Sequence, residues 1–207
     1  MSDTPSNKAT KLRELRRDLG GAIFNPFGTT EFVIDGGFIN RAQSAMKRKN
    51  PEIIPSFNFV AMREQILFMA VEVESSVFPD IRLFRSIRNT RERIESARDM
   101  AELIKPVITH MYPYDKEFGP PSFFSMYFSM LAPRVQEDFT VFVTDDPAYP
   151  LVRTRLGRHT VVGPEAWSNF DFGETKFIEF EKFRQFVNAD KPYKDDVDWQ
   201  PMTDEDA

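Results

Sequence analysis

The sequence predicts an α+β fold that is predominantly helical, with about five helices, two short β-hairpins and one further strand. Three observations predict it. Apolar residues recur every three or four positions in several separate stretches, which is typical of amphipathic helices. Glycine next to aspartate or arginine separates short apolar runs, which is typical of hairpin turns. The 207 residues include 21 phenylalanines, so the chain is long enough for one domain with an aromatic core.

The two ends of the chain differ from its middle. Residues 1–9 are polar, and residues 189–207 are acidic. We therefore expect a disordered N-terminal tail and an acidic C-terminal tail around a single globular domain at 10–188. The first 50 residues carry a net charge of +4, and residues 171–207 carry −6. This polarity suits head-to-tail association between copies or self-shielding of a basic surface, and two solvated, partly disordered ends are the interpretation that we favour.

Short elements are expected at the N-terminal end of the domain. Residues 11–19 fit a short basic helix that ends at Gly20 and Gly21. Asp35-Gly36-Gly37 lies inside an apolar stretch at 31–39. Asp-Gly readily adopts the positive φ angles of a tight turn, so we expect a small hairpin there.

Longer helices are expected next. Residues 41–49 fit a basic helical turn or two, and the strongest helix prediction is 59–77, where apolar residues have helical spacing. Ile81, Phe84 and Ile87 step by three and favour a further helical segment. Asn89 and Glu92 have the spacing of a capping box and predict a helix that ends near Pro106.

The last third of the chain mixes strands and helices. The Phe/Met-rich segment 122–131 predicts a short helix, and 139–144 predicts a strand. Gly157-Arg158 predicts the turn of a second hairpin at 151–162. Phenylalanines three apart predict a last helix at 177–187. The residues expected to be mostly buried are Phe59, Ile66, Ile94, Ile104, Phe124, Phe128, Phe142, Phe180 and Phe183.

Standard catalytic and cofactor motifs are absent from the sequence. It has no cysteine and only two histidines, His110 and His159, which are far apart. We therefore assign no catalytic residue, no cofactor and no metal ligand, and we favour a protein that is not an enzyme. Asp145 and Asp146 leave a carboxylate-only Mg²⁺ site open, although adjacent aspartates before a proline are more typical of a turn.

Arginines form the most distinctive pattern of charge. Arg82, Arg85, Arg88 and Arg91 recur every three residues, and Arg93 follows. On a helix they would spread over a broad face. Arginine binds phosphates well because its planar guanidinium donates paired hydrogen bonds. We predict that these five residues contact nucleic-acid phosphates, and pairing with nearby glutamates is the alternative.

These features together predict a non-enzymatic assembly protein, such as a coat or nucleocapsid-like subunit that self-associates and contacts nucleic acid. The alternatives are a small enzyme with an unfamiliar Asp/Glu/Tyr/Arg active site and a regulatory protein-binding module. We expect no membrane span, because the longest stretch without charge, 119–133, is short and contains prolines. The predicted location is intracellular, in the cytoplasm or in a virion.

Overall fold

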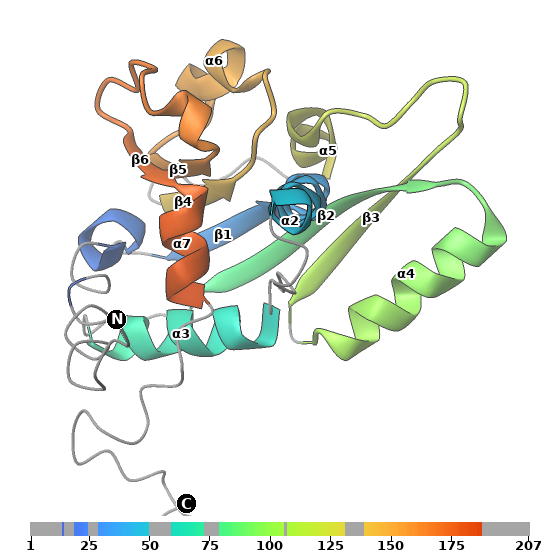
Figure 1. Ribbon diagram of the computed structural model, residues 1–207, viewed down its shortest axis with the longest axis horizontal. Coiled ribbons are helices and arrows are strands. Elements are labelled where there is room, and N and C mark those ends of the chain that lie inside the picture. The colour runs from blue at the N-terminus through green and yellow to red at the C-terminus, as the bar shows by residue number, and fades with distance from the viewer. Residues whose placement is uncertain are drawn as a thin grey trace, which may run out of the picture.

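The computed structural model is an α/β fold built on one six-stranded, all-parallel sheet in the order β3-β2-β1-β4-β5-β6 (Figure 1). The predicted α+β fold with hairpins is therefore wrong. Parallel neighbours need crossover connections, and every strand pair of this sheet is parallel. The structure describes residues 14, 19–24, 29–49, 59–72, 79–105, 107–130 and 139–187. The tails expected at 1–9 and 189–207 lie outside these residues.

Strands and helices alternate along most of the chain. The strands are β1 (Thr30–Asp35), β2 (Asp80–Arg88), β3 (Ile108–Tyr114), β4 (Phe139–Val143), β5 (His159–Gly163) and β6 (Lys176–Glu179). The α-helices are α2 (Gly36–Lys49), α3 (Phe59–Glu72), α4 (Arg91–Leu103), α5 (Phe123–Met130), α6 (Tyr149–Val152) and α7 (Phe180–Val187). Two 3₁₀ turns, η1 (Arg153–Arg155) and η2 (Glu165–Trp167), complete the described elements, together with a helical segment at 19–23.

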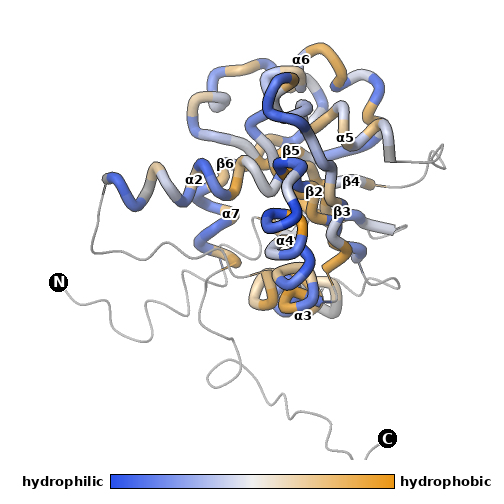
Figure 2. The backbone as a smooth tube through the Cα atoms, turned by 90° about the vertical axis from the view of Figure 1, so that its right-hand side faces the viewer, coloured by the Kyte–Doolittle hydropathy of each residue, from blue (hydrophilic) through white to orange (hydrophobic). Residues whose placement is uncertain are grey.

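Helices cover both faces of the sheet. On one face, α2, α3 and α7 pack with the sheet into an apolar cluster that includes Phe38, Ile66 and Phe183. On the other face, α5 and α6 pack into an aromatic cluster that includes Phe124 and Tyr149. In Figure 2, α5 and α6 lie above the strands and α3 lies below them. The central strands are thus buried on both sides. This explains why β1 and β4 carry neighbouring apolar residues instead of alternating apolar and polar ones.

The first predicted hairpin is replaced by a strand-to-helix junction. Asp35 ends β1, and α2 begins at Gly36. A Cβ atom on Gly36 would lie 2.9 Å from Cγ of Arg85 and 3.1 Å from the carbonyl oxygen of Phe84. The glycine therefore allows α2 to begin close against β2. Gly36 was expected to form a hairpin turn. It is instead required because α2 and β2 approach each other closely at this position.

The second predicted hairpin is also wrong. Its first arm, at 151–156, forms the end of α6 and the 3₁₀ turn η1, and only its second arm is a strand, β5. Gly157 does adopt the expected positive φ of 69°. It connects a helical segment to a parallel strand, so the turn residue was identified correctly but its partners were not.

The predicted helical segment around 81–87 is the strand β2. The three-residue step of Ile81, Phe84 and Ile87 is genuine, because all three side chains are buried. A strand that is buried on both faces does not alternate strictly, so this step does not distinguish it from a helix. The arginine pattern that shares this segment is therefore not a helical face.

Other predicted elements are confirmed where the structure describes them. The helices α3, α4 and α5 and the strand β4 match their expected positions. The helix expected to end at Gly20 and Gly21 does not end there, because the helical segment at 19–23 includes both glycines. The predicted helix at 177–187 begins only at Phe180, because Phe177 belongs to β6. Of the predicted core residues, Ile66, Phe124, Phe142, Phe180 and Phe183 are buried. Phe59, Ile94 and Ile104 are partly buried, and Phe128 is exposed.

Candidate functional site

The order of the strands creates a topological switch point at the carboxyl edge of the sheet. From β1 the chain proceeds outward to β2 and β3, then returns to β4 on the other side of β1 and proceeds to β5 and β6. Connections therefore diverge between β1 and β4. In open parallel sheets, ligands bind outside the carboxyl ends of the strands at this switch point. Ile34 pairs with Val143, so the residues that follow the two strands lie side by side.

Asp35 lies at this switch point. It is the last residue of β1 and only 5% exposed. Its Oδ1 atom accepts a hydrogen bond of 2.8 Å from the backbone N–H of Gly37, in the first turn of α2. The hydroxyl of Thr144 lies 3.4 Å from its Oδ2 atom. Burial nevertheless raises the pKa of the Asp35 carboxyl above its usual range, because desolvation outweighs these contacts.

Arg41 links the ends of the two strands. Its guanidinium forms two hydrogen bonds with Asp145, 3.1 Å from Nε to Oδ2 and 2.5 Å from Nη2 to Oδ1. The same Nη2 atom lies 3.3 Å from Oδ2 of Asp35. The paired carboxylates raise the pKa of Arg41, the hydrogen bonds with Asp145 contributing most. A cation thus bridges two carboxylates that come from different strands.

Asp145 and Asp146 have different surroundings. The buried side chain of Asp146 accepts hydrogen bonds from the backbone N–H groups of Phe124 and Ala148, at 3.0 and 2.9 Å. It therefore fixes the start of α5 to the turn that precedes α6. Asp145 is more exposed and points to Arg41. The turn that the sequence analysis favoured is present at Asp146, and only Asp145 belongs to the switch point.

A groove of about 580 Å³ opens beside the bridge. It lies between α2, the loop after β5 and the first turn of α7. Its side on α2 carries Arg41 and Arg48, and the opposite side carries Asp145, Glu165 and Glu181. Glu181 is paired with Arg184, and this hydrogen bond lowers the pKa of its carboxyl. The groove therefore presents guanidinium groups on one side and carboxylates on the other.

No metal centre of the usual kind is built from the described residues, since no three His, Asp or Glu side chains converge among them. The switch point offers two carboxylates, Asp35 and Asp145. Two carboxylates are too few for a structural metal site, which is closed by a full set of protein ligands. They are compatible with Mg²⁺, because this ion commonly binds through one or two carboxylates, several waters and the phosphate of a substrate.

The five predicted arginines are not brought together. Arg82 forms a 2.6 Å ion pair with the buried Glu31. Arg85 reaches α4, where its Nη1 atom lies 3.0 Å from Sδ of Met100, and burial lowers its pKa. Arg91 pairs with Glu95 at 2.7 Å. Of the five, only Arg88 and Arg93 are exposed and make no ion pair with the described residues.

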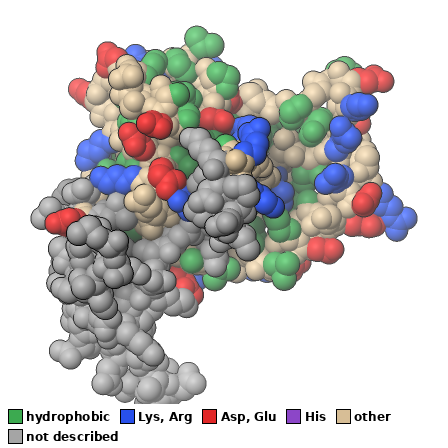
Figure 3. Space-filling view, in the orientation of Figure 1, with side chains coloured by type: hydrophobic (Ala, Val, Ile, Leu, Met, Phe, Trp, Pro, Cys, Tyr) green, Lys and Arg blue, Asp and Glu red, His purple; other side chains and the backbone are tan. Residues whose placement is uncertain are grey.

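The exposed arginines nevertheless lie on the same side of the sheet as Asp35 and Asp145, at the carboxyl ends of the strands. Arg88 is the last residue of β2, and Arg91 and Arg93 lie in the first turn of α4. All three are therefore near the carboxyl edge, beyond the switch point. In Figure 3, blue side chains lie on the right-hand part, over the region of β2, β3 and α4, mixed with red ones, and further blue side chains lie on the left and in the centre.

His159 has a structural role. Its Nδ1 atom is 2.8 Å from the carbonyl oxygen of Gly157, and its Nε2 atom is 2.9 Å from the hydroxyl of Tyr149. The carbonyl can only accept, so Nδ1 carries the proton and Tyr149 donates to Nε2. Burial lowers the pKa of His159, which keeps the ring neutral.

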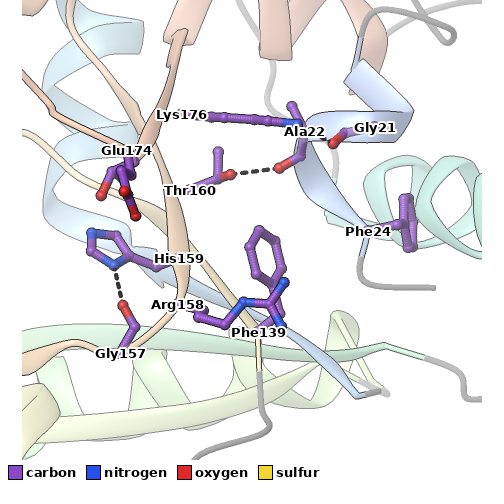
Figure 4. A pocket seen from close by; sticks show the side chains of 11 residues that line it. Gly21, Ala22, Phe24, Phe139, Gly157, Arg158, His159, Thr160, Glu174 and Lys176 are labelled. Atoms are coloured by element: carbon purple, nitrogen blue, oxygen red, sulfur yellow. Dashed lines mark hydrogen bonds between the residues drawn. The ribbon is translucent and has the colours of Figure 1, made fainter. Parts of the chain in front are cut away.

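A second pocket, of about 420 Å³, lies at the opposite, amino edge of the sheet (Figure 4). Arg158 and Glu174 line it, and Lys176 spans it to donate to the carbonyl of Gly21. Thr160 donates to the carbonyl of Ala22. Lys176 and Thr160 therefore hold the segment at 19–23 against the sheet.

Sequence reasoning missed Asp35 and Arg41. The signal that identifies Asp35 is a short apolar run that ends in Asp-Gly-Gly and is followed by a helix-forming segment, which is the pattern of a strand and its crossover. Nothing local identifies the pairing of Arg41 with Asp145, because the two are 104 residues apart. Compared with family models, with curated protein sequences and with solved structures, the chain matches none.

Proposed function

We propose that the protein is a Mg²⁺-dependent phosphodiesterase that acts on nucleic acid. The observation that carries this proposal is the position of two carboxylates, Asp35 and Asp145, at the switch point of a doubly wound sheet. The adjoining groove carries guanidinium groups, which suit a phosphate. This proposal develops the enzyme alternative of the sequence analysis and keeps its expectation of phosphate contacts.

The chemistry requires few groups. A Mg²⁺ ion held by Asp35 and Asp145 would bind a phosphate oxygen, offset its charge and lower the pKa of a bound water. With the ion held by Asp35 and Asp145, the chemistry supplied would be hydrolysis: water would add to phosphorus, the bond from phosphorus to the ester oxygen would break, and the leaving oxygen would take up a proton. The burial of Asp35 supports this role, because a carboxylate in a partly dry site interacts strongly with a cation.

The polymer class is supported by the exposed arginines. Arg88 and Arg93 lie beyond the switch point on the same edge of the sheet, with Phe118 exposed in the loop after β3. A strand that reaches the switch point with one phosphodiester would contact these side chains with its next phosphates. Arginine and an exposed ring are the groups that bind single strands with little sequence preference.

The direct test is hydrolysis of a single-stranded oligonucleotide with Mg²⁺ and with EDTA. We expect cleavage only with Mg²⁺, and a loss of at least about a hundredfold in Asp35→Asn and in Asp145→Asn, as when one electrostatic group is removed from an active site. Asp99→Asn is the control, because Asp99 is exposed on α4. Cleavage that survives EDTA, or that all three variants retain, would refute the proposal.

Self-association is the second candidate function. Large apolar side chains are exposed on the described surface, and Leu103, Phe118 and Leu151 are each at least 80% exposed. Such residues favour a contact between copies when they form a patch. The mass of the purified protein in solution, measured by light scattering at low and high salt, tests it. A monomer at both salt concentrations would remove the assembly hypothesis.

No described helix has the length and apolar character needed to cross a membrane. We propose an intracellular location.

A further inference from the structure

Two arginines lie over the rings of two phenylalanines near α5 and α6, which cover the same face of the sheet (Figure 1). The guanidinium carbon of Arg155 is 5.2 Å from the centre of the Phe128 ring, and that of Arg153 is 5.4 Å from the centre of the Phe170 ring. Both arginines belong to η1, whereas Phe128 lies in α5 and Phe170 in the loop after η2. These four residues from three segments form what we call the η1 surface.

Both rings of this surface are exposed but anchored. Phe128 is 38% exposed and Phe170 is 36% exposed. Phe128 packs against the buried ring of Phe124, and Phe170 packs against the buried ring of Tyr149, with ring centres 6.4 Å apart in each pair. A ring that is already held in position loses little conformational entropy when a ligand binds to it.

The two arginines have few partners of their own. Arg153 and Arg155 form no ion pair with any described residue. Arg153 donates one hydrogen bond to the carbonyl oxygen of Asp171. Residues 118–136 and 147–164, which include α5, α6 and η1, contain no Asp or Glu. Most of the N–H groups of both guanidiniums are therefore available to an anion.

The acidic side chains of the neighbouring loop do not cancel this charge. Asp171 is adjacent, and its carboxylate accepts the backbone N–H of Gly173. Glu165 lines the groove beside Asp145, and Glu174 lines the pocket at the amino edge of the sheet. The η1 surface thus has two guanidinium groups against one adjacent carboxylate, which favours an anionic ligand.

The combination of rings and guanidinium groups indicates the class of anion. Nucleobases stack on aromatic rings and on guanidinium planes, and phosphates accept hydrogen bonds from guanidinium N–H groups. A single strand offers both kinds of group, whereas the bases of a duplex are already stacked on one another. An acidic peptide would use the charges of this surface without requiring its rings.

We propose that the η1 surface binds single-stranded nucleic acid, with bases stacked on Phe128 and Phe170 and neighbouring phosphates bound by Arg153 and Arg155. This inference rests on the proposed function for the class of polymer, and it names a surface that binds it. It concerns binding and not cleavage, so its test is made in EDTA.

The experiment measures the fluorescence anisotropy of a labelled oligothymidylate at several salt concentrations. Phe128→Leu and Phe170→Leu should each weaken binding about tenfold, because a stacked base is lost while an apolar side chain remains. Neither variant should change the slope of log K against log salt. Arg155→Gln should reduce that slope by about 0.7, which corresponds to one phosphate contact.

Arg98→Gln is the matched control, because Arg98 is exposed on α4 and its replacement removes the same charge outside the η1 surface. It should change the affinity by less than about twofold. An oligomer of abasic sugar phosphates tests stacking on the wild type itself, without any risk of misfolding. It should bind about tenfold more weakly than the oligothymidylate.

Several results would overturn the proposal. The wild type could fail to bind at low salt, the abasic oligomer could bind as tightly as the oligothymidylate, or Arg98→Gln could lower the slope as much as Arg155→Gln. Displacement of the oligothymidylate by polyglutamate at equal concentration of charge would assign the surface to acidic peptides instead.

These outcomes are separate from those of the proposed function. Binding as expected in EDTA, without cleavage in Mg²⁺, would retain the η1 surface and remove the phosphodiesterase. Cleavage that depends on Asp35 and Asp145, with unchanged binding in the Phe128, Arg155 and Phe170 variants, would do the reverse.

Discussion

Asp35 and Asp145 follow neighbouring strands, but the two carboxylates have different surroundings. Asp35 is buried beneath the first turn of α2, whereas Asp145 is partly exposed at the mouth of the groove. Burial of a carboxylate opposes folding unless its partners compensate, and the raised pKa of Asp35 indicates that Gly37 and Arg41 do not compensate fully. A residue kept at such a cost is typical of a functional site.

Asp35→Asn should therefore stabilise the metal-free protein at pH 7. The amide oxygen can still accept from Gly37, and the desolvated charge is removed. The raised pKa means that, as pH rises above the unfolded value near 3.8, the unfolded state loses its proton first and stability falls. The advantage of Asp35→Asn should thus grow as pH rises from 3.5 to 7.

Urea unfolding at several pH values measures this difference. Asp99→Asn serves as the control, and its stability relative to wild type should stay nearly constant. A variant that is less stable than wild type at pH 7 would show that the bond from Arg41 to Asp35 outweighs the cost of burial.

Residue-level chemistry was only partly predictable from the sequence. Asp145 and Asp146 were recognised as either a Mg²⁺ site or a turn. The turn is present at Asp146, which accepts from two backbone N–H groups, whereas Asp145 pairs with Arg41. Arg82 was predicted to contact phosphate, yet its guanidinium pairs with Glu31. Exposure decides whether an arginine is available, and exposure depends on partners that are distant in sequence.

At the scale of elements, glycine explains the largest errors. Gly36 and Gly37 follow an aspartate between two apolar runs, which is also the pattern of a hairpin. The two readings differ in whether the second run pairs back with the first or forms a helix. Local propensity does not distinguish a hairpin from a strand followed by a helix. The close contact between α2 and β2 at Gly36, which only the folded chain contains, is what distinguishes them.

Gly36→Ala should destabilise the protein by about 1–3 kcal/mol, as overpacking of a tight site typically does. The added Cβ would lie 3.1 Å from a backbone oxygen of β2, which cannot move as easily as the end of a side chain. Chemical denaturation measures the change in the free energy of unfolding.

Gly21→Ala is the matched control for that substitution. Gly21 lies in the helical segment at 19–23, and nothing lies within 4 Å of the Cβ that alanine would add. Alanine is favoured over glycine in a helix by about 0.5–1 kcal/mol, so this variant should be slightly more stable. If both substitutions change stability alike, the close approach at Gly36 is not what requires a glycine there.

The whole molecule owes its switch point to the order of its strands. The sequence predicted the presence of helices, the strand β4 and five buried core residues out of nine named, because these follow from local periodicity. Pairings such as Thr30 with Phe139 join segments more than a hundred residues apart, and no local pattern encodes them. The site between β1 and β4 could therefore not be assembled from the sequence.

The arginines provide a prediction at this scale. Replacing Arg88 and Arg93 together with Gln should weaken the binding of single-stranded nucleic acid without destabilising the fold, since neither forms an ion pair with the described residues. Each lost phosphate contact should reduce the slope of log K against log salt by about 0.7. Filter binding at several salt concentrations gives this slope. An unchanged slope would show that nucleic acid does not contact these arginines.

Arg82→Gln provides the contrast, because it should destabilise the fold by about 3–5 kcal/mol by removing the guanidinium that pairs with the buried carboxylate of Glu31. Weaker binding of nucleic acid by this variant would then follow from unfolding and would not report a phosphate contact.

The central claim is that Asp35 and Asp145 share a divalent cation at the switch point. Crystals soaked in Mn²⁺ with inorganic phosphate, measured at a wavelength where manganese scatters anomalously, test it most directly. The account predicts one anomalous peak within about 2.2 Å of an oxygen of each carboxylate, with a phosphate beside it. A switch point without a peak, in which Arg41 still bridges both carboxylates, would contradict it.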